Sequence, residues 1–184
     1  MIGIPRFHLA PVLSTRDLKA ALAYHCCTRE IVGWDLSLRC RTDEALVALH
    51  RAVLEALPFG SRGMGLTLTT DDGTQFTSAR YVETLNRLGI THRRTAYNHP
   101  EGNSYIERFH RSLKEEEVWL NEYQNFDQAK RSIAHWIAEY NHDRPHCGLR
   151  GRTPHESRAQ FFAQTLYFKH GPLCLVLRGA LHKM

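Results

Sequence analysis

The chain has 184 residues, 42% of them hydrophobic, with a formal net charge of +5 and a pI near 9.1. This length allows one domain with a real core and excludes a large second domain. The basic balance favours a polyanionic partner, although a charge of this size is also ordinary for solubility.

The five cysteines show no C-x-x-C spacing, so neither a zinc site nor a disulfide framework is indicated. An odd number of cysteines without a secretory segment fits a reducing cytoplasm. No apolar run approaches the roughly 20 residues that span a bilayer, so we expect no membrane partner.

The first third of the chain predicts an irregular start, a strand and a helix. Residues 1–21 contain two prolines and no sustained periodicity, and residues 18–24 could supply only an imperfect strand. Residues 22–38 are predicted as strand, because apolar and polar positions alternate through Val32, Trp34, Leu36 and Leu38. A helix should follow, with Thr42 as its N-cap and acidic residues in its first turn, and end before Pro58.

The middle of the chain predicts two short strands around a helix. Residues 66–70 are rich in β-forming residues and deliver Asp71 at a strand end. The next helix should be capped by Thr77 or Ser78 and end at Gly89. Residues 90–94 can form one more strand. Residues 95–102 form a loop by their Asn, Pro and Gly content.

The last part predicts helices. A helix starting at Ser104 has an apolar face formed by Ile106, Phe109 and Leu113. A second helix, residues 127–141, presents Ile133, Trp136, Ile137 and Tyr140 inward and is stopped by Pro145. A short helix should extend to about residue 164, and residues 165–184 are expected to be a tail. This order of elements predicts an α/β layer fold.

Two carboxylates with a basic rim dominate the chemistry. Asp71 and Glu107 are separated by 35 residues, and Glu107 shares its helix face with Arg111 and Lys114 at i+4 and i+7. Carboxylates beside cations suggest metal-assisted phosphoryl transfer on nucleic acid. Simpler interpretations stand beside this one: Asp71 and Asp72 before a glycine could only make a turn, and Glu107 could only pair with Arg111.

Three separated motifs carry a family resemblance. They are residues 70–76 (TDDGTQF), the helix with Glu107, and residues 139–146 (EYNHDRPH), in that order. Together they resemble the integrase catalytic core of insertion-sequence transposases, over about residues 26–156. The resemblance implies a ribonuclease-H-like, three-layer α/β fold across residues 22–164, with an incomplete N-terminal strand.

The resemblance also implies a site and its partners. Asp71 and Glu107 would be the second and third ligands of an Asp-Asp-Glu triad that holds Mg²⁺. The DNA contacts would be Arg111 and Lys114 first, then Arg108, His110 and Arg144, although on periodicity alone Arg111 and Lys114 could be no more than an outer helix face. Expected partners are transposon ends and target DNA, with a further copy of the chain or an intact transposase. The expected location is a bacterial, nucleoid-associated cytoplasmic one.

One part of the family pattern is missing. The first Asp of the triad should lie in a Trp-x-x-Asp-x-Thr strand, and residues 1–23 contain no such pattern. His25 stands where relatives often have a different, non-catalytic Asp. Asp17 and Asp35 are the nearest possible replacements, but neither has the expected context. We therefore expect an N-terminally truncated, catalytically impaired transposase core. The alternatives are a non-catalytic module that binds DNA or intact transposase, and a working nuclease with another third ligand.

Overall fold

A five-stranded mixed sheet organises the computed structural model, which describes residues 18–39, 41–57, 60–94, 104–167 and 174–179. The strand order is β2-β1-β5-β3-β4. β1 is antiparallel to both of its neighbours, whereas β3 is parallel to β5 and β4. The strands are β1 (Lys19–His25), β2 (Ile31–Ser37), β3 (Thr67–Thr70), β4 (Thr91–Arg94) and β5 (Cys174–Gly179).

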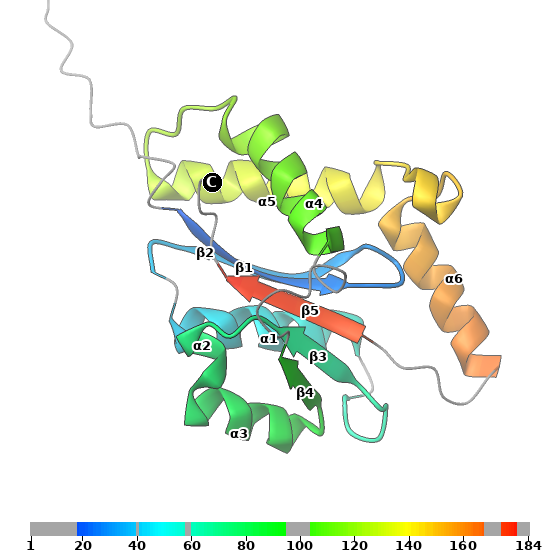
Figure 1. The fold of residues 1–184 in the computed structure, drawn as a ribbon. Helices are drawn as coiled ribbons and strands as arrows, with labels where there is room; N and C mark the ends of the chain where they lie inside the picture. The colour runs from blue at the N-terminus through cyan, green and yellow to red at the C-terminus, as the bar shows by residue number, and fades with distance from the viewer. Residues whose placement is uncertain (1–17, 40, 58–59, 95–103, 168–173, 180–184) are drawn as a thin grey trace, which may run out of the picture.

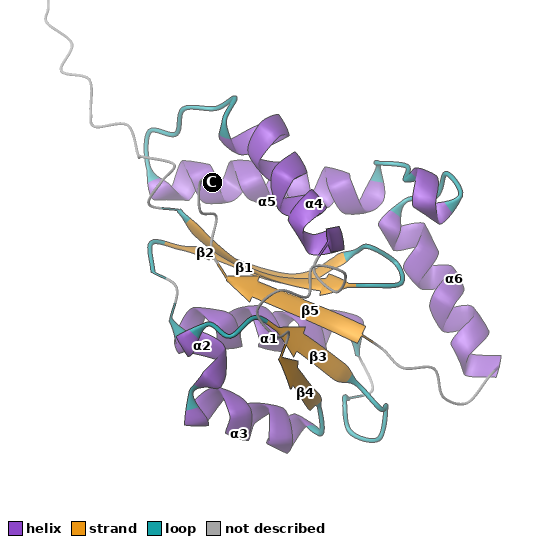
Figure 2. Cartoon of the chain, viewed as in Figure 1, coloured by secondary structure: helices purple, strands orange, loops and turns teal. Residues whose placement is uncertain are grey.

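Helices cover both faces of this sheet, which makes the predicted three-layer α/β arrangement (Figures 1 and 2). The helices α1, α2 and α3 lie on one face, α4 and α5 on the other, and α6 stands beside one end. Their bounds are α1 (Thr42–Ala56), α2 (Thr74–Thr77), α3 (Ala79–Leu88), α4 (Ser104–Leu113), α5 (Phe126–His142) and α6 (Pro154–Tyr167), with a π-helical turn η2 (Lys114–Val118) and a 3-10 turn η3 (Cys147–Leu149). In the described part of the chain, no helix is long and apolar enough to cross a membrane.

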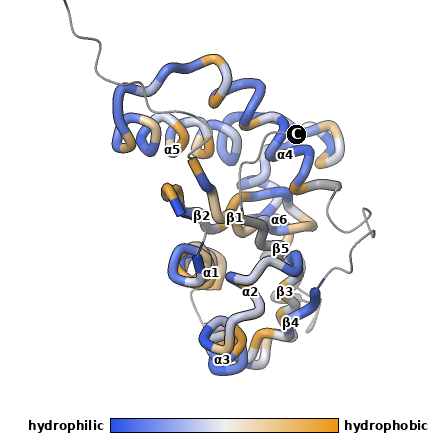
Figure 3. Tube along the Cα trace, turned by 60° about the vertical axis from the view of Figure 1, so that its left-hand side comes forward, coloured by the Kyte–Doolittle hydropathy of each residue, from blue (hydrophilic) through white to orange (hydrophobic). Residues whose placement is uncertain are grey.

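The period-two pattern of β1 explains why two hydrophobic clusters form. Ala21 and Ala23 join the cluster on the α1 side, whereas Leu22 and Tyr24 join the cluster on the α5 side. Along the helices, hydrophobic and hydrophilic residues alternate as amphipathic packing requires (Figure 3). Gly33 in β2 allows α1 to approach closely, because a Cβ there would collide with the α1 backbone.

Most of the predicted elements are confirmed, including their end signals. α1 begins at Thr42, so Arg41 and not the expected Thr42 is its N-cap. The Ser78 hydroxyl accepts a hydrogen bond from the Tyr81 N–H to cap α3, as predicted. Gly89 ends α3 in the left-handed conformation. The loop predicted at residues 95–102 lies outside the described residues.

The two ends of the domain differ from the prediction. The single strand expected over residues 22–38 is a hairpin, because the chain turns back between β1 and β2. Residues 165–184 were expected to be a tail, but α6 crosses the boundary at 164 and β5 lies in the middle of the sheet. A short apolar run does not reveal its distant pairing partners, so the sequence alone could not place β5.

Candidate functional site

Asp71 follows the last residue of β3, as its sequence context predicted. Thr70 is fully buried, whereas the Asp71 side chain is only half-buried. The Gly73 N–H donates to Asp71 Oδ1 at 3.0 Å, so the carboxylate also shapes the turn between β3 and α2. The turn interpretation is thus correct for the local geometry. It does not exclude a ligand role, because a carboxylate has a second oxygen.

The surroundings of Asp71 include a histidine and an arginine from β4. His92 Nε2 lies 2.8 Å from the Thr70 hydroxyl, and burial, followed by the charge of Arg94, lowers the pKa of His92. Asp72 is exposed and lies 3.9 Å from Arg94, which is a weak ion pair in water. Asp72 therefore lies at the solvent-exposed surface beside the end of β3.

Glu107 occupies the face of α4 that the sequence predicted. Ile106, Phe109 and Leu113 are buried on the opposite face, and Glu107 is exposed. The packing of α4 against the sheet thus leaves Glu107, Arg108 and Arg111 toward solvent. That Glu107 shares a cleft with Asp71 remains a prediction.

Neither strand that pairs with β3 carries a further acid. Its neighbours are β5 and β4, and residues 174–179 (CLVLRG) and 91–94 (THRR) contain no Asp or Glu. Across the part of the chain that the structure describes, no three His, Cys, Asp or Glu side chains gather to hold a metal. Magnesium can be held through one or two carboxylates and several waters, but a two-metal centre needs a carboxylate that both ions share.

Asp35 is engaged elsewhere. It lies on the edge strand β2, which β1 and β5 separate from β3, so three strand spacings of about 4.8 Å place it about 14 Å from β3. Its carboxylate pairs with Arg51 at 3.3 Å and Lys130 at 3.5 Å. Asp35 therefore links β2 to α1 and α5. Asp17 lies outside the described residues.

His25 is a structural residue of the turn between β1 and β2. Its side chain is 1% exposed, and Nδ1 lies 2.7 Å from the Thr28 hydroxyl. Burial, followed by the charge of Arg158, lowers the pKa of His25 to about 4. His25 is therefore neutral at pH 7 and is not suited to carry charge.

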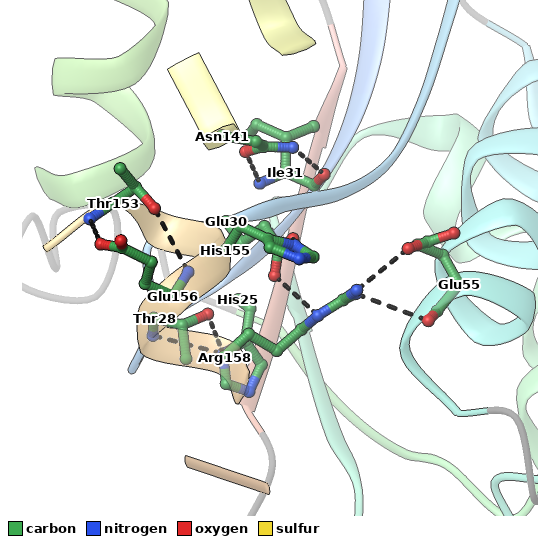
Figure 4. A network of polar contacts seen from close by, with 10 residues as sticks. All are labelled: His25, Thr28, Glu30, Ile31, Glu55, Asn141, Thr153, His155, Glu156 and Arg158. Atoms are coloured by element: carbon green, nitrogen blue, oxygen red, sulfur yellow. Dashed lines mark hydrogen bonds and ion pairs between the residues drawn. The ribbon is translucent and has the colours of Figure 1, made fainter. Parts of the chain in front are cut away.

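An ion network joins this turn to two helices (Figure 4). Arg158 from α6 lies 3.0 Å from Glu30 and 3.0 Å from Glu55 of α1. Burial raises the pKa of Glu30, while Arg158 and then His155 oppose this shift. The network fixes α6 beside the sheet, so its role is structural.

The motif at residues 139–146 divides into structural and surface roles. Asn141 Nδ2 donates to the Ile31 carbonyl at 2.9 Å, and the Ile31 N–H donates to Asn141 Oδ1 at 3.0 Å. The Tyr140 ring packs in the core, 4.8 Å from the ring of Phe109. Both residues thereby attach α5 to the rest of the domain, whereas Arg144 and His146 lie beyond its end.

The basic residues expected at DNA fall into three groups. Arg111 is exposed and Lys114 is half-buried, as surface contacts require. His110 is only 7% exposed, which places it in the core and disfavours the predicted contact. Arg108 and Arg144 line one cavity of about 400 Å³. The sequence analysis missed a third arginine in that cavity, Arg29, because nothing local marks it.

Matches to known families cover most of the chain. Two family models described as "Integrase core domain" match residues 8–100 and residues 88–154. The chain is 32% identical over 128 residues to a transposase for insertion sequence element IS904 of Lactococcus lactis subsp. lactis, which covers 69% of this chain and 49% of that protein. It is 25% identical over 144 residues to transposase InsD for insertion element IS2D of Escherichia coli, covering 76% of this chain and 46% of that protein.

The solved structures agree with the fold. The catalytic core domain of BIV integrase superposes with a TM-score of 0.52 at 19% identity, over 72% of this chain and 82% of that domain. At this identity the likeness concerns the fold alone. The chain spans about half the length of the curated relatives it matches.

Proposed function

This chain belongs to the integrase core domain family, and from that premise we propose that it binds DNA through the phosphate backbone while its metal site is incomplete. Membership supports DNA as the partner, since the curated relatives named above are transposases. The basic side chains of α4 and η2 support an electrostatic mode, because neutralised phosphates release counterions. The surface of Arg111, exposed on α4, is the natural first contact.

The proposed metal ligands are Asp71 and Glu107. If their carboxylates converge, they fit one Mg²⁺ with retained water molecules, and such an ion would polarise a phosphoryl oxygen. The two carboxylates themselves would hold and orient the ion rather than contact the phosphate or transfer a proton. For both carboxylates to bind one ion, a ligand oxygen of each must lie within about 4 Å of the other, which is twice the Mg–O bond of about 2.1 Å.

The proposal of an incomplete metal site is supported by the composition of the two strands that pair with β3. Because β5 and β4 contain no Asp or Glu, the strands that pair with β3 supply no further carboxylate for a two-metal centre at Asp71. Asp35 does not substitute, because two other strands separate β2 from β3 and its carboxylate pairs with Arg51 and Lys130. This favours binding without efficient catalysis by this chain alone. A second copy, or an intact transposase, is the further partner we propose.

Fluorescence anisotropy with labelled duplexes tests the binding proposal. Random and transposon-end duplexes should bind with similar affinity, and affinity should fall steeply between 50 and 200 mM salt, as phosphate contacts predict. Arg111→Gln should weaken both alike. A strong preference for the transposon end that survives high salt would contradict backbone binding.

A further inference from the structure

A basic cavity separates the end of α5 from the turn between β1 and β2. Its volume is about 400 Å³, and Arg29, Arg108, Arg144 and His146 line it together. These residues come from the hairpin turn, from α4, and from the segment after α5, so distant parts of the chain bring the cations together. Among the described residues that line it, none is acidic.

The conformation of Arg29 sets this arginine apart. Its φ is 61°, in the left-handed region that a residue other than Gly, Asn or Asp rarely adopts. A backbone outlier of this kind is worth a functional hypothesis. We therefore considered the position of the Arg29 guanidinium.

The guanidinium of Arg29 lies directly against Gly148. A Cβ added at Gly148 would collide with the end of the Arg29 side chain. Gly148 is in η3 and its φ is not in the left-handed region, so the backbone would accept alanine. The missing side chain therefore leaves the space in which Arg29 enters the cavity.

His146 supplies a second polar group. Its Nε2 is buried and makes no hydrogen bond within the protein, while its ring packs 4.9 Å from that of Tyr140. Burial, then the charges of Arg144 and Arg29, lower the pKa of His146. A bound anion would satisfy Nε2 and offset the surrounding positive charge.

Arg144 already forms an ion pair with an acidic residue. Glu116 accepts two hydrogen bonds from its guanidinium, at 2.5 and 2.8 Å, from outside this cavity. Glu116 thus offsets part of the positive charge that Arg144 brings to the cavity. The ion pair holds Arg144 in a fixed orientation at the cavity wall.

We propose that this cavity is a binding site for a backbone phosphate of DNA, held by Arg29 and Arg108 with His146 and Arg144 at its wall. The inference rests on the proposed function for the source of the phosphate, and it adds a site on the hairpin turn to the contacts expected on α4. Arginine forks match phosphate oxygens, and the cavity has room for a phosphodiester with its water molecules.

Three variants of the full chain test the site by anisotropy with a duplex. Arg29→Asn removes the charge and keeps a residue that tolerates the left-handed backbone. Gly148→Ala displaces the Arg29 guanidinium while leaving the net charge unchanged. Arg87→Gln is the matched control, because Arg87 is an exposed arginine on α3 paired with Glu83. Circular dichroism checks that all three variants fold.

Losing one phosphate contact reduces the magnitude of the slope of log affinity against log salt by about 0.9, which corresponds to about an eightfold loss of affinity at 0.1 M salt relative to 1 M. We expect this eightfold loss of affinity for Arg29→Asn, a loss of several-fold for Gly148→Ala, and a smaller change for Arg87→Gln. Equal losses in Arg29→Asn and Arg87→Gln, or wild-type affinity in Gly148→Ala, would overturn the site while leaving DNA binding by the chain intact.

An NMR titration separates the two possible sources of phosphate. The His146 ring signals should shift when duplex is added, and not in Arg29→Asn. Inorganic phosphate should shift them only weakly, because it lacks the neighbouring backbone contacts. A strong response to inorganic phosphate from a chain that does not bind duplex would overturn the DNA assignment. Failure of wild-type binding in the anisotropy assay would instead reject the proposed function.

Discussion

Replacing Asn141 with alanine should destabilise the domain by about 2 kcal/mol, because it removes two hydrogen bonds worth about 1 kcal/mol each. Both bonds go to the backbone of Ile31, the first residue of the edge strand β2. The cost stays below full desolvation of two buried groups, because a cavity of about 540 Å³ lined by Asn141 and Ile31 gives water access to them.

The aspartate variant sharpens this prediction. Asn141→Asp keeps the acceptor for the Ile31 N–H but places an oxygen against the Ile31 carbonyl, so at pH 7 it should cost at least as much as alanine. Burial and the loss of the donor raise the folded-state pKa of the new carboxyl above its unfolded value. The stability it retains is therefore present at low pH, where the protonated carboxyl donates, and is lost as pH rises.

Urea unfolding followed by far-ultraviolet circular dichroism measures both variants. Wild type provides the pH baseline, and Asn86→Ala, at an exposed position of α3, provides the control for loss of an amide. A free energy of unfolding for Asn141→Ala within about 0.5 kcal/mol of wild type, the usual range for a surface substitution, would exclude a stabilising role for these two hydrogen bonds. An Asn141→Asp variant whose stability does not recover in acid relative to wild type would exclude it as well.

Three further predictions concern His25, Arg158 and Asp71. The folded-state pKa of His25 is about 4 against an ordinary value of 6.5, so the unfolded state binds more protons between these values. Its contribution to the free energy of unfolding should therefore fall by about 2 kcal/mol from pH 8 to pH 5. Urea unfolding measures this fall, and the same dependence of stability on pH in His25→Gln would contradict it. Arg158→Met should lower the free energy of unfolding by about 3 kcal/mol at pH 7, because it leaves Glu30 buried without its main cation. The loss should shrink in acid as Glu30 is protonated. A thermal unfolding midpoint equal to that of wild type would exclude a stabilising role for Arg158. Asp71→Asn should leave the free energy of unfolding within about 0.5 kcal/mol, because the amide oxygen can still accept from the Gly73 N–H, whereas a loss above 2 kcal/mol would make Asp71 chiefly a fold residue.

Local signals in the sequence were sufficient to predict the helices and strands that surround the site. Ser78 and Gly89 marked both ends of α3, and the spacing of Ile106, Phe109 and Leu113 identified which face of α4 is buried. With one face assigned to the core, Glu107 had to lie toward solvent. These predictions depend on contacts within a few residues, which is why they hold.

Residues that depend on distant contacts were not predictable in the same way. β5 is a short apolar strand whose neighbours are about 150 and 100 residues away in sequence, β1 and β3. Arg29 joins Arg108 and Arg144 only after the hairpin, α4 and the end of α5 have packed together. His110 was expected at DNA from the family resemblance, but helix packing leaves it only 7% exposed.

Metal-dependent cleavage tests the central claim most directly. With saturating duplex and Mg²⁺ or Mn²⁺, this chain should release no 3′-end product above a metal-free blank, and Asp71→Asn and Glu107→Gln should give the same result. A full-length transposase relative in the same assay shows that the conditions support cleavage. Cleavage by the present chain that requires metal and is abolished by Asp71→Asn would contradict the claim, because it would show that another residue completes the metal site.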